Sequence, residues 1–173
     1  MQEDDAILIS MPRQAETTKG QTQMGDRAVA GFKAKSETPT IFLYQHWSGE
    51  GQNRWFAEAL EAARPRWSDD SYATRIMISQ LVGDQWNSET GFGLYVGGTS
   101  HGADYHYILI ADFEKQMVLI AENDNSDNVI AEISFDDYIL NYEVLVPNST
   151  MEINQKKHEE FIAKYPELAG AFS

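Results

Sequence analysis

The sequence predicts an α+β protein, with a mixed or mostly antiparallel sheet of about four to six strands and helices packed on it. The hydrophobic period changes along the chain: it is helical between residues 52 and 82, and typical of strands between residues 92 and 133. The helical segments follow one strand and precede several others, instead of alternating regularly with strands. This order favours the α+β class over a doubly wound α/β sheet.

Length and composition predict one globular domain with a polar N-terminal extension. The chain has 173 residues, 42% of them hydrophobic, which suits a single domain with a sizeable core. Residues 12–40 are rich in small and polar side chains, and only residues 6–9 before them could form a short strand. We therefore expect a flexible polar arm over residues 1–38 and a single α+β domain over residues 39–173.

The first strand and two helices come next. Residues 40–46 form an apolar run with hydrophobic side chains on both faces, which predicts an interior strand. A helix is expected from Gln52 and Asn53, with Asn53 as a possible N-cap, to Arg64, where Pro65 stops it. A second helix starts at residues 68–70 and ends at Gly83.

Strands dominate the middle of the chain. Residues 92–96 alternate apolar and other side chains, and residues 105–111 and 116–121 are apolar runs joined by four residues, which predicts a hairpin. A short strand is expected at 129–133, and Ser134 is a candidate cap for a short helix. Residues 142–146 read as extended. A capping box at 149–152 precedes a final helix that ends at Pro166.

Charge is distributed unevenly. The formal net charge is −14, and residues 76–155 contain one basic side chain, Lys115, against thirteen acidic ones. A field of one sign repels nucleic acid and anionic membranes and attracts basic surfaces. The simpler alternative is that the charge only keeps the protein soluble. The expected partner-binding acidic face comprises Glu122, Asp124, Asp127, Asp136 and Asp137.

A candidate ligand site follows the first strand. His46 stands at the strand end before a glycine-containing loop, where it could act as a base, a ligand or a donor to a bound anion. Arg75 on the second helix would pair with Asp112 or Glu89 and could join this pocket. The alternatives are a packed histidine and a structural ion pair, with the four tryptophans in the core or pocket wall. The candidate ligand-binding residues are His46, Trp47, Ser48, Gly49, Arg75, Glu89 and Asp112.

The sequence matches none of the catalytic or metal-binding motifs considered next. Ser48 is not in a G-x-S-x-G elbow, and no Gly-Lys-Ser/Thr follows residues 49–51 as a P-loop requires. His101 and His106, with Asp104, could share a metal only if their turn bends favourably. The oxygen-rich segment 122–128 lacks the glycine and final glutamate of an EF-hand. The absence of cysteine excludes thiolate sites and disulfides. We expect no catalytic residue, metal or cofactor.

Five blocks carry a family resemblance. They are Tyr44-x-His46-Trp47-x-Gly49, Arg66-Trp67-x-Asp69-Asp70-x-Tyr72-x-x-Arg75-Ile76, Glu89-Thr90-Gly91-Phe92-Gly93, the strand end 108–112, and Ser134-Phe135-Asp136-Asp137. In this order they resemble a family of small proteins encoded by tailed phages and prophages, over roughly residues 41–140. The resemblance implies a phage origin and a shared compact domain, and it brings no activity.

Together these observations predict a phage-encoded acidic accessory protein that binds a host protein with a basic surface stoichiometrically, possibly inhibiting host defence. We expect it in the host cytoplasm, because the N-terminus is acidic and no apolar run reaches the roughly 20 residues of a membrane helix. Direct binding of nucleic acid or membrane is not expected. The alternatives are a protein that binds a small ligand or nucleotide signal, a modest hydrolase using the His46 loop, or a minor virion component.

Overall fold

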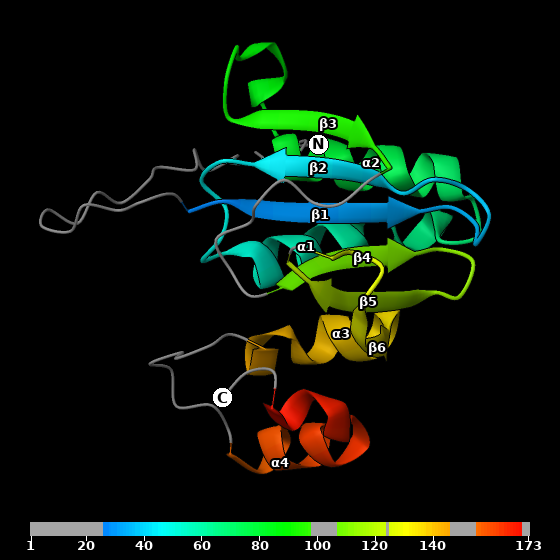
Figure 1. Cartoon of the computed structure of the whole chain (residues 1–173), viewed down its shortest axis with the longest axis vertical. Helices are drawn as coiled ribbons and strands as arrows, with labels where there is room; N and C mark the ends of the chain where they lie inside the picture. Colours follow the sequence, from blue (N-terminus) through cyan, green and yellow to red (C-terminus); the bar gives the residue numbers. More distant parts are fainter. Residues whose placement is uncertain (1–25, 98–106, 124, 146–154, 171–173) are drawn as a thin grey trace, which may run out of the picture.

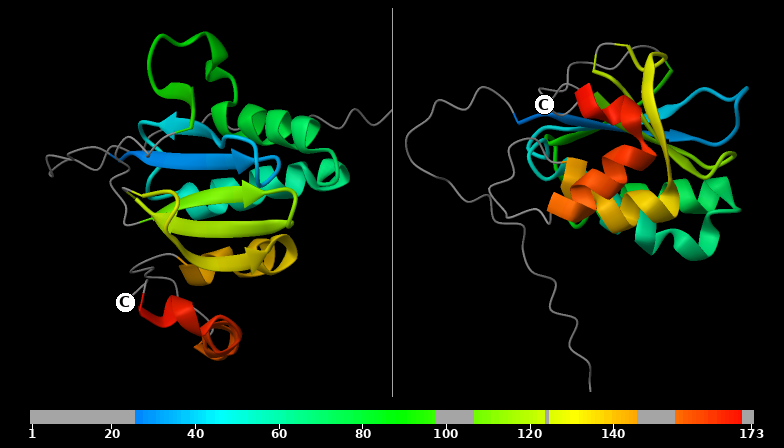
Figure 2. Two further views of the ribbon diagram at one scale, coloured as in Figure 1. Left: turned by 45° about the vertical axis from the view of Figure 1, so that its right-hand side comes forward. Right: turned by 90° about the horizontal axis from the view of Figure 1, so that it is seen from below.

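A computed structural model describes residues 26–97, 107–123, 125–145 and 155–170. Six strands form one mixed sheet in the order β3-β2-β1-β4-β5-β6, with the helices gathered on one side of it (Figures 1 and 2). This confirms the predicted α+β class. The strands are β1 Ala28–Lys33, β2 Ile41–Gln45, β3 Phe92–Val96, β4 Tyr107–Asp112, β5 Met117–Glu122 and β6 Val129–Ser134. The helices are α1 Gln52–Ala62, α2 Asp70–Val82, α3 Phe135–Asn141 and α4 Gln155–Lys164, with 3-10 turns η1 Arg64–Arg66, η2 Gln85–Asn87, η3 Tyr142–Leu145 and η4 Pro166–Gly170.

Strand β1 corrects the expected domain boundary. It lies in the middle of the sheet, antiparallel to β2 and parallel to β4, and its apolar residues from Ala28 to Phe32 are at most 2% exposed. The expected flexible arm is therefore wrong for residues 28–33, and the folded domain begins before Pro39. At Gly31 the strand has no room for a side chain, because a Cβ there would lie 2.8 Å from Ile110 Cγ1. The possible strand at residues 6–9 lies outside the described residues.

The remaining strands follow the predicted pattern. β4 is buried along its whole length, as expected of an interior strand, and forms the predicted hairpin with β5. β2 lies between β1 and β3, so the first predicted strand is indeed interior. Its alternation directs Phe42 and Tyr44 to the helix-free face and Leu43 to the face that the helices cover. Each face thus has an apolar layer of its own.

The helix ends show which local signals operate. Ser134 caps α3 as predicted, and its Oγ accepts a hydrogen bond of 3.2 Å from Asp137 N. α2 ends at Gly83, whose φ of 63° lies in the region that favours glycine. The N-cap of α1 is Gly51, so the role expected for Asn53 is wrong, and residues 142–145 form η3 instead of an extended segment. The capping box at 149–152 lies outside the described residues.

The main core lies between the sheet and the helices. Phe56 and Leu60 of α1, Met77 and Leu81 of α2 and Tyr138 of α3 are nearly fully buried there. A second, smaller apolar cluster covers the helix-free face and comprises Val29, Phe42, Ile108, Ile110, Leu119 and Ala121. Within the part of the chain that the structure describes, no helix combines the length and the apolar character that crossing a bilayer requires.

Candidate functional site: an exposed aromatic corner beside an edge strand

Two loops that are distant in sequence meet at one corner of the sheet. His46 N donates a 2.9 Å hydrogen bond to Gly91 O, and β2 and β3 pair directly beyond this contact. A Cβ on Gly91 would lie 3.1 Å from Trp47 Cζ3, and the φ of Gly91 is 103°. Only glycine therefore suits the place where the Trp47 ring lies against the chain. We call loops 46–51 and 84–91 together the Trp47 corner.

Asp26 ties the first of these loops to the start of β1. Its backbone oxygen accepts a 3.0 Å hydrogen bond from Gly49 N, and its Oδ1 accepts one of 2.9 Å from Glu50 N. Asp26 thus occupies the backbone N–H groups of two loop residues, Gly49 and Glu50, just before α1. Gly49 and Ser48 are buried, whereas Trp47 and Glu50 are exposed. Of the predicted loop residues, Trp47 is therefore the one available to a large partner.

His46 is held between two aromatic side chains. Tyr44 lies on β2 and His46 directly follows the strand, and the Tyr44 hydroxyl lies 2.8 Å from His46 Nδ1. The His46 ring meets the Trp47 ring edge-on, with centroids 4.7 Å apart. Among the described residues no bond reaches His46 Nε2. The structure thus gives His46 a clear packing role and leaves one ring nitrogen for a ligand.

The corner continues into an exposed apolar strip. Trp47 is 58% exposed and Trp86, on η2, is 53% exposed. Leu94 and Val96 on the adjoining strand β3 are 54% and 66% exposed. The expectation that the tryptophans belong to the core or a pocket wall is therefore wrong for Trp47 and Trp86. Sequence alone offered no signal for this, because the apolar pattern of β3 looks the same whether a helix covers it or not.

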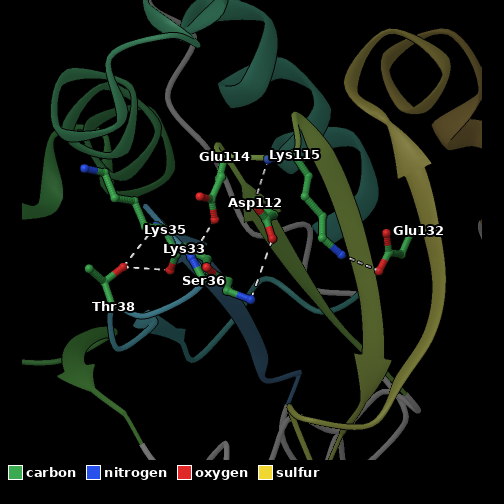
Figure 3. Close-up of polar contacts among 8 residues, drawn as sticks. All are labelled: Lys33, Lys35, Ser36, Thr38, Asp112, Glu114, Lys115 and Glu132. Atoms are coloured by element: carbon green, nitrogen blue, oxygen red, sulfur yellow. Dashed lines mark hydrogen bonds and ion pairs between the residues drawn. The ribbon is translucent and has the colours of Figure 1, made fainter.

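The predicted grouping of Arg75 with Asp112 is wrong. Asp112 is 1% exposed; its Oδ2 lies 3.7 Å from Lys33 Nζ and its Oδ1 accepts a 3.0 Å hydrogen bond from Lys115 N (Figure 3). Lys33 comes from β1, the strand that the sequence did not predict. Arg75 is exposed on α2 and has no ion pair among the described residues, with Glu89 or with any other carboxylate.

Asp112 and His46 lie at opposite ends of the sheet. The register pairs Ala28 with Gln45 at one end of β1, and Lys33 with Asp112 at the other. One pocket cannot contain both His46 and Asp112. The polar residues around Asp112 instead form a network in which Ser36 N donates a 2.7 Å hydrogen bond to Glu114 Oε2 (Figure 3). This bond lowers the pKa of the Glu114 carboxyl.

Two hollows also open at this end, away from the Trp47 corner. One has a volume of about 340 Å³ and is lined mainly by the β1–β2 loop, with Lys33, Phe42 and Asp127. The other, of about 170 Å³, lies between the same loop and residues such as Trp67 and Phe113. Neither includes any of the ligand candidates of the His46 loop.

Two carboxylates of the expected acidic face are already paired with basic side chains. Asp136 pairs with Arg64 at 2.6 Å, and Asp137 Oδ2 lies 2.6 Å from both Lys164 Nζ and the Tyr165 hydroxyl. The hydrogen bonds from Lys164 and Tyr165 lower the pKa of Asp137. These pairs sit at the start of α3, and neutralise much of the charge there.

Of the other acidic residues, Glu122 ends strand β5 and Asp127 belongs to the loop that precedes β6. Glu122 is half-buried and Asp127 is exposed, while Asp124 lies outside the described residues. Asp127 lines the larger hollow together with Lys33 of β1. The partner-binding acidic face over Glu122, Asp124, Asp127, Asp136 and Asp137 stays a prediction, and two of its carboxylates, Asp136 and Asp137, are already paired with basic side chains.

A buried polar network lies at the start of α1, the helix that follows the first loop of the Trp47 corner. Asn53 Nδ2 donates a 2.7 Å hydrogen bond to the Tyr107 hydroxyl, and the Tyr138 hydroxyl lies 3.1 Å from Asn53 Oδ1 and 3.2 Å from Asn53 O. Burial raises the pKa of Tyr107 and, more strongly, that of Tyr138. Both hydroxyls therefore stay protonated at neutral pH. Three elements far apart in sequence meet here, which a single-sequence pattern does not reveal.

The possible metal site at His101, Asp104 and His106 lies outside the described residues. Within the described ranges, no group of three or more histidine and carboxylate side chains is arranged to hold a metal ion. The structure thus presents an exposed aromatic corner, an edge strand with exposed apolar side chains and a ring nitrogen on His46. Comparison with models of protein families, with curated proteins and with solved structures finds no match.

Proposed function

We propose that this protein acts by stoichiometric binding to another protein, through the Trp47 corner and the adjoining strand β3. The observation that carries the proposal is the exposure of Trp47 and Trp86 on neighbouring loops, next to Leu94 and Val96. Apolar side chains that gather on a surface mark interaction sites. Tryptophan is among the residues that contribute most binding energy in protein interfaces.

Charge indicates what kind of partner fits. Glu50, Asp84 and Glu89 in the Trp47 corner are exposed, and residues 76–114 contain no lysine or arginine. A partner with a basic surface would be attracted over long range and would pair with these carboxylates at the rim. The proposal therefore places the acidic surface that meets the partner at these loops, in preference to residues 122–137.

The resemblance of the sequence supplies the biological setting of the proposal. The protein is a phage-encoded accessory factor in the host cytoplasm, its partner is a host protein, and binding inhibits a host defence function. The net charge of −14 supports a basic protein as partner, and speaks against nucleic acid or an anionic membrane.

Affinity capture from host lysate tests the proposal with the full chain. The wild type should retain a basic protein in a salt-sensitive manner, and a Trp47→Ala/Trp86→Ala variant should retain much less. Tyr72→Ala is the matched control, because Tyr72 is a similarly exposed aromatic residue on α2. Equal retention by the double variant and the wild type, or retention of nothing by the wild type, would contradict the proposal.

A second candidate is binding of a small ligand at His46, favoured by the ring nitrogen Nε2 that no described residue engages. Nucleotides, cyclic nucleotides and metal ions would be screened by thermal shift. A ligand of this site should raise the melting temperature of the wild type and not that of His46→Ala. The absence of any shift in the wild type would exclude these ligands.

A further inference from the structure

We propose that strand β3 is the docking strand itself: an extended basic segment of the partner adds to its outer edge as a seventh strand. This inference rests on the proposed function and names the way in which the partner is held. Among the described strands β3 has a single neighbour, β2. The opposite edge strand, β6, is contacted by η4 at the C-terminal end of the described chain (Figure 1).

The backbone of β3 presents an ordered set of outward groups. His46 N donates to Gly91 O and Gly97 N donates to Thr40 O, each at 2.9 Å. In an antiparallel pair the residues that bond to the neighbour alternate along the strand. Gly93 and Tyr95 therefore bond to β2, in the same direction as Gly91 and Gly97. The N–H and C=O groups of residues 92, 94 and 96 point the other way, to the open side.

The same residues carry the exposed apolar side chains. The register places Leu94 opposite Leu43 and Val96 opposite Ile41, so both side chains lie on the face that the helices cover elsewhere. An added strand would hydrogen-bond with residues 92, 94 and 96, and its alternate side chains would cover Leu94 and Val96. Backbone bonds would provide affinity and the alternate side chains specificity, as in other cases of strand addition.

β3 lacks the features that keep edge strands apart from other chains. Residues 92–96 contain no charge and no proline. The neighbouring charges are Asp84 and Glu89, both exposed and both acidic. A basic segment is therefore attracted, whereas a second copy of this chain would bring the same acidic loops and a net charge of −14. Charge complementarity thus identifies a basic partner segment as the occupant.

The experiment uses a synthetic peptide of alternating lysine and valine, with two control peptides. One control has N-methyl groups on alternate backbone amides, and the other has glutamate in place of lysine. Binding is measured by fluorescence anisotropy, and hydrogen exchange of single amides by NMR. The lysine peptide should slow exchange at Leu94 and Val96 while Tyr95, which already bonds inward, changes little. Both control peptides should bind at least roughly tenfold more weakly.

Two variants at one position separate backbone from side chain. Val96→Pro removes an outward N–H, which edge strands tolerate, and Val96→Thr keeps that N–H and a β-branched shape. The proline variant should bind the lysine peptide roughly tenfold more weakly than the threonine variant. If the proline variant does not fold, the comparison of the methylated and unmethylated peptides decides.

Three results would overturn strand addition. One is equal binding by the proline and threonine variants with unchanged exchange at Leu94 and Val96. Another is no binding of the lysine peptide to the wild type. The third is a doubled mass in the absence of peptide, with Leu94 and Val96 protected, since the occupant would then be a second copy. Capture of a basic protein that depends on Trp47 would still support the proposed function in each case.

Discussion

Replacing Gly31 with alanine should destabilise the protein, because the side chains of Ile110 and Phe42 fill the space beside Gly31. An added Cβ would meet Ile110 Cγ1 at 2.8 Å and Phe42 Cε1 at 3.1 Å. Ile110 and Phe42 belong to the apolar cluster on the helix-free face and are at most 3% exposed. Neither side chain can move aside without disturbing its own packing.

The expected cost follows from overpacking. Extra methyl groups in a well-packed core cost about 1–3 kcal/mol of unfolding free energy. For a domain of this size each kcal/mol lowers the melting temperature by about 2–4 °C. Gly31→Ala should therefore lower the melting temperature by roughly 2–12 °C.

Gly93→Ala is the matched control in the same sheet. A Cβ there would meet only Tyr44 Cβ, at 3.9 Å, which is ordinary contact. Because alanine loses less backbone entropy on folding than glycine, this variant should be neutral or slightly more stable. Both variants are compared by urea and thermal unfolding. If Gly31→Ala were as stable as the wild type, residues 28–33 would not be the packed central strand described above.

Three further changes probe the corner, the C-terminal helix and the buried network. Gly91→Ala should lower the free energy of unfolding by about 1–3 kcal/mol, because a φ of 103° strains alanine. It should also shift the fluorescence of Trp47, and unchanged emission would contradict the contact between Gly91 and the Trp47 ring. Asp137→Asn should cost about 1–2 kcal/mol at pH 7 through loss of charge-assisted hydrogen bonds. The folded pKa of Asp137 is lowered, so its stabilisation is present above the unfolded pKa of about 3.9 and is lost as pH falls through the folded value. Urea unfolding of variant and wild type should therefore converge in acid, and a constant difference would refute the pair. Tyr138→Phe should cost about 1–2 kcal/mol in the same assay by removing the bonds to Asn53, and no loss would show that they contribute nothing.

Local signals predicted much of this fold. The hairpin of β4 and β5 and the Ser134 cap of α3 each depend on residues close in sequence. Hydrophobic period and turn spacing reveal such features directly. The predicted class and the positions of most strands are therefore correct.

The features that the sequence did not reveal depend on contacts between residues that are far apart along the chain. β1 is short and rich in alanine and glycine, and is central only because β4, about 80 residues later, lies beside it. Without β1 the sequence does not indicate Lys33 as the partner of Asp112, and it offers Arg75 as a partner for Asp112 or Glu89. The exposure of Trp47 and Trp86 likewise depends on which helices cover the end of the sheet. Pattern alone does not contain that information.

Hydrogen exchange on a complex purified from host lysate tests the central claim most directly. The exchange rates of the amides of the chain described here are compared between the free protein and the complex. The account predicts new protection at the outward amides of Leu94 and Val96 and in the loops around Trp47 and Trp86. Protection confined to the exposed surfaces of α1, α2 or α4, with β3 and the Trp47 corner unchanged, would contradict it.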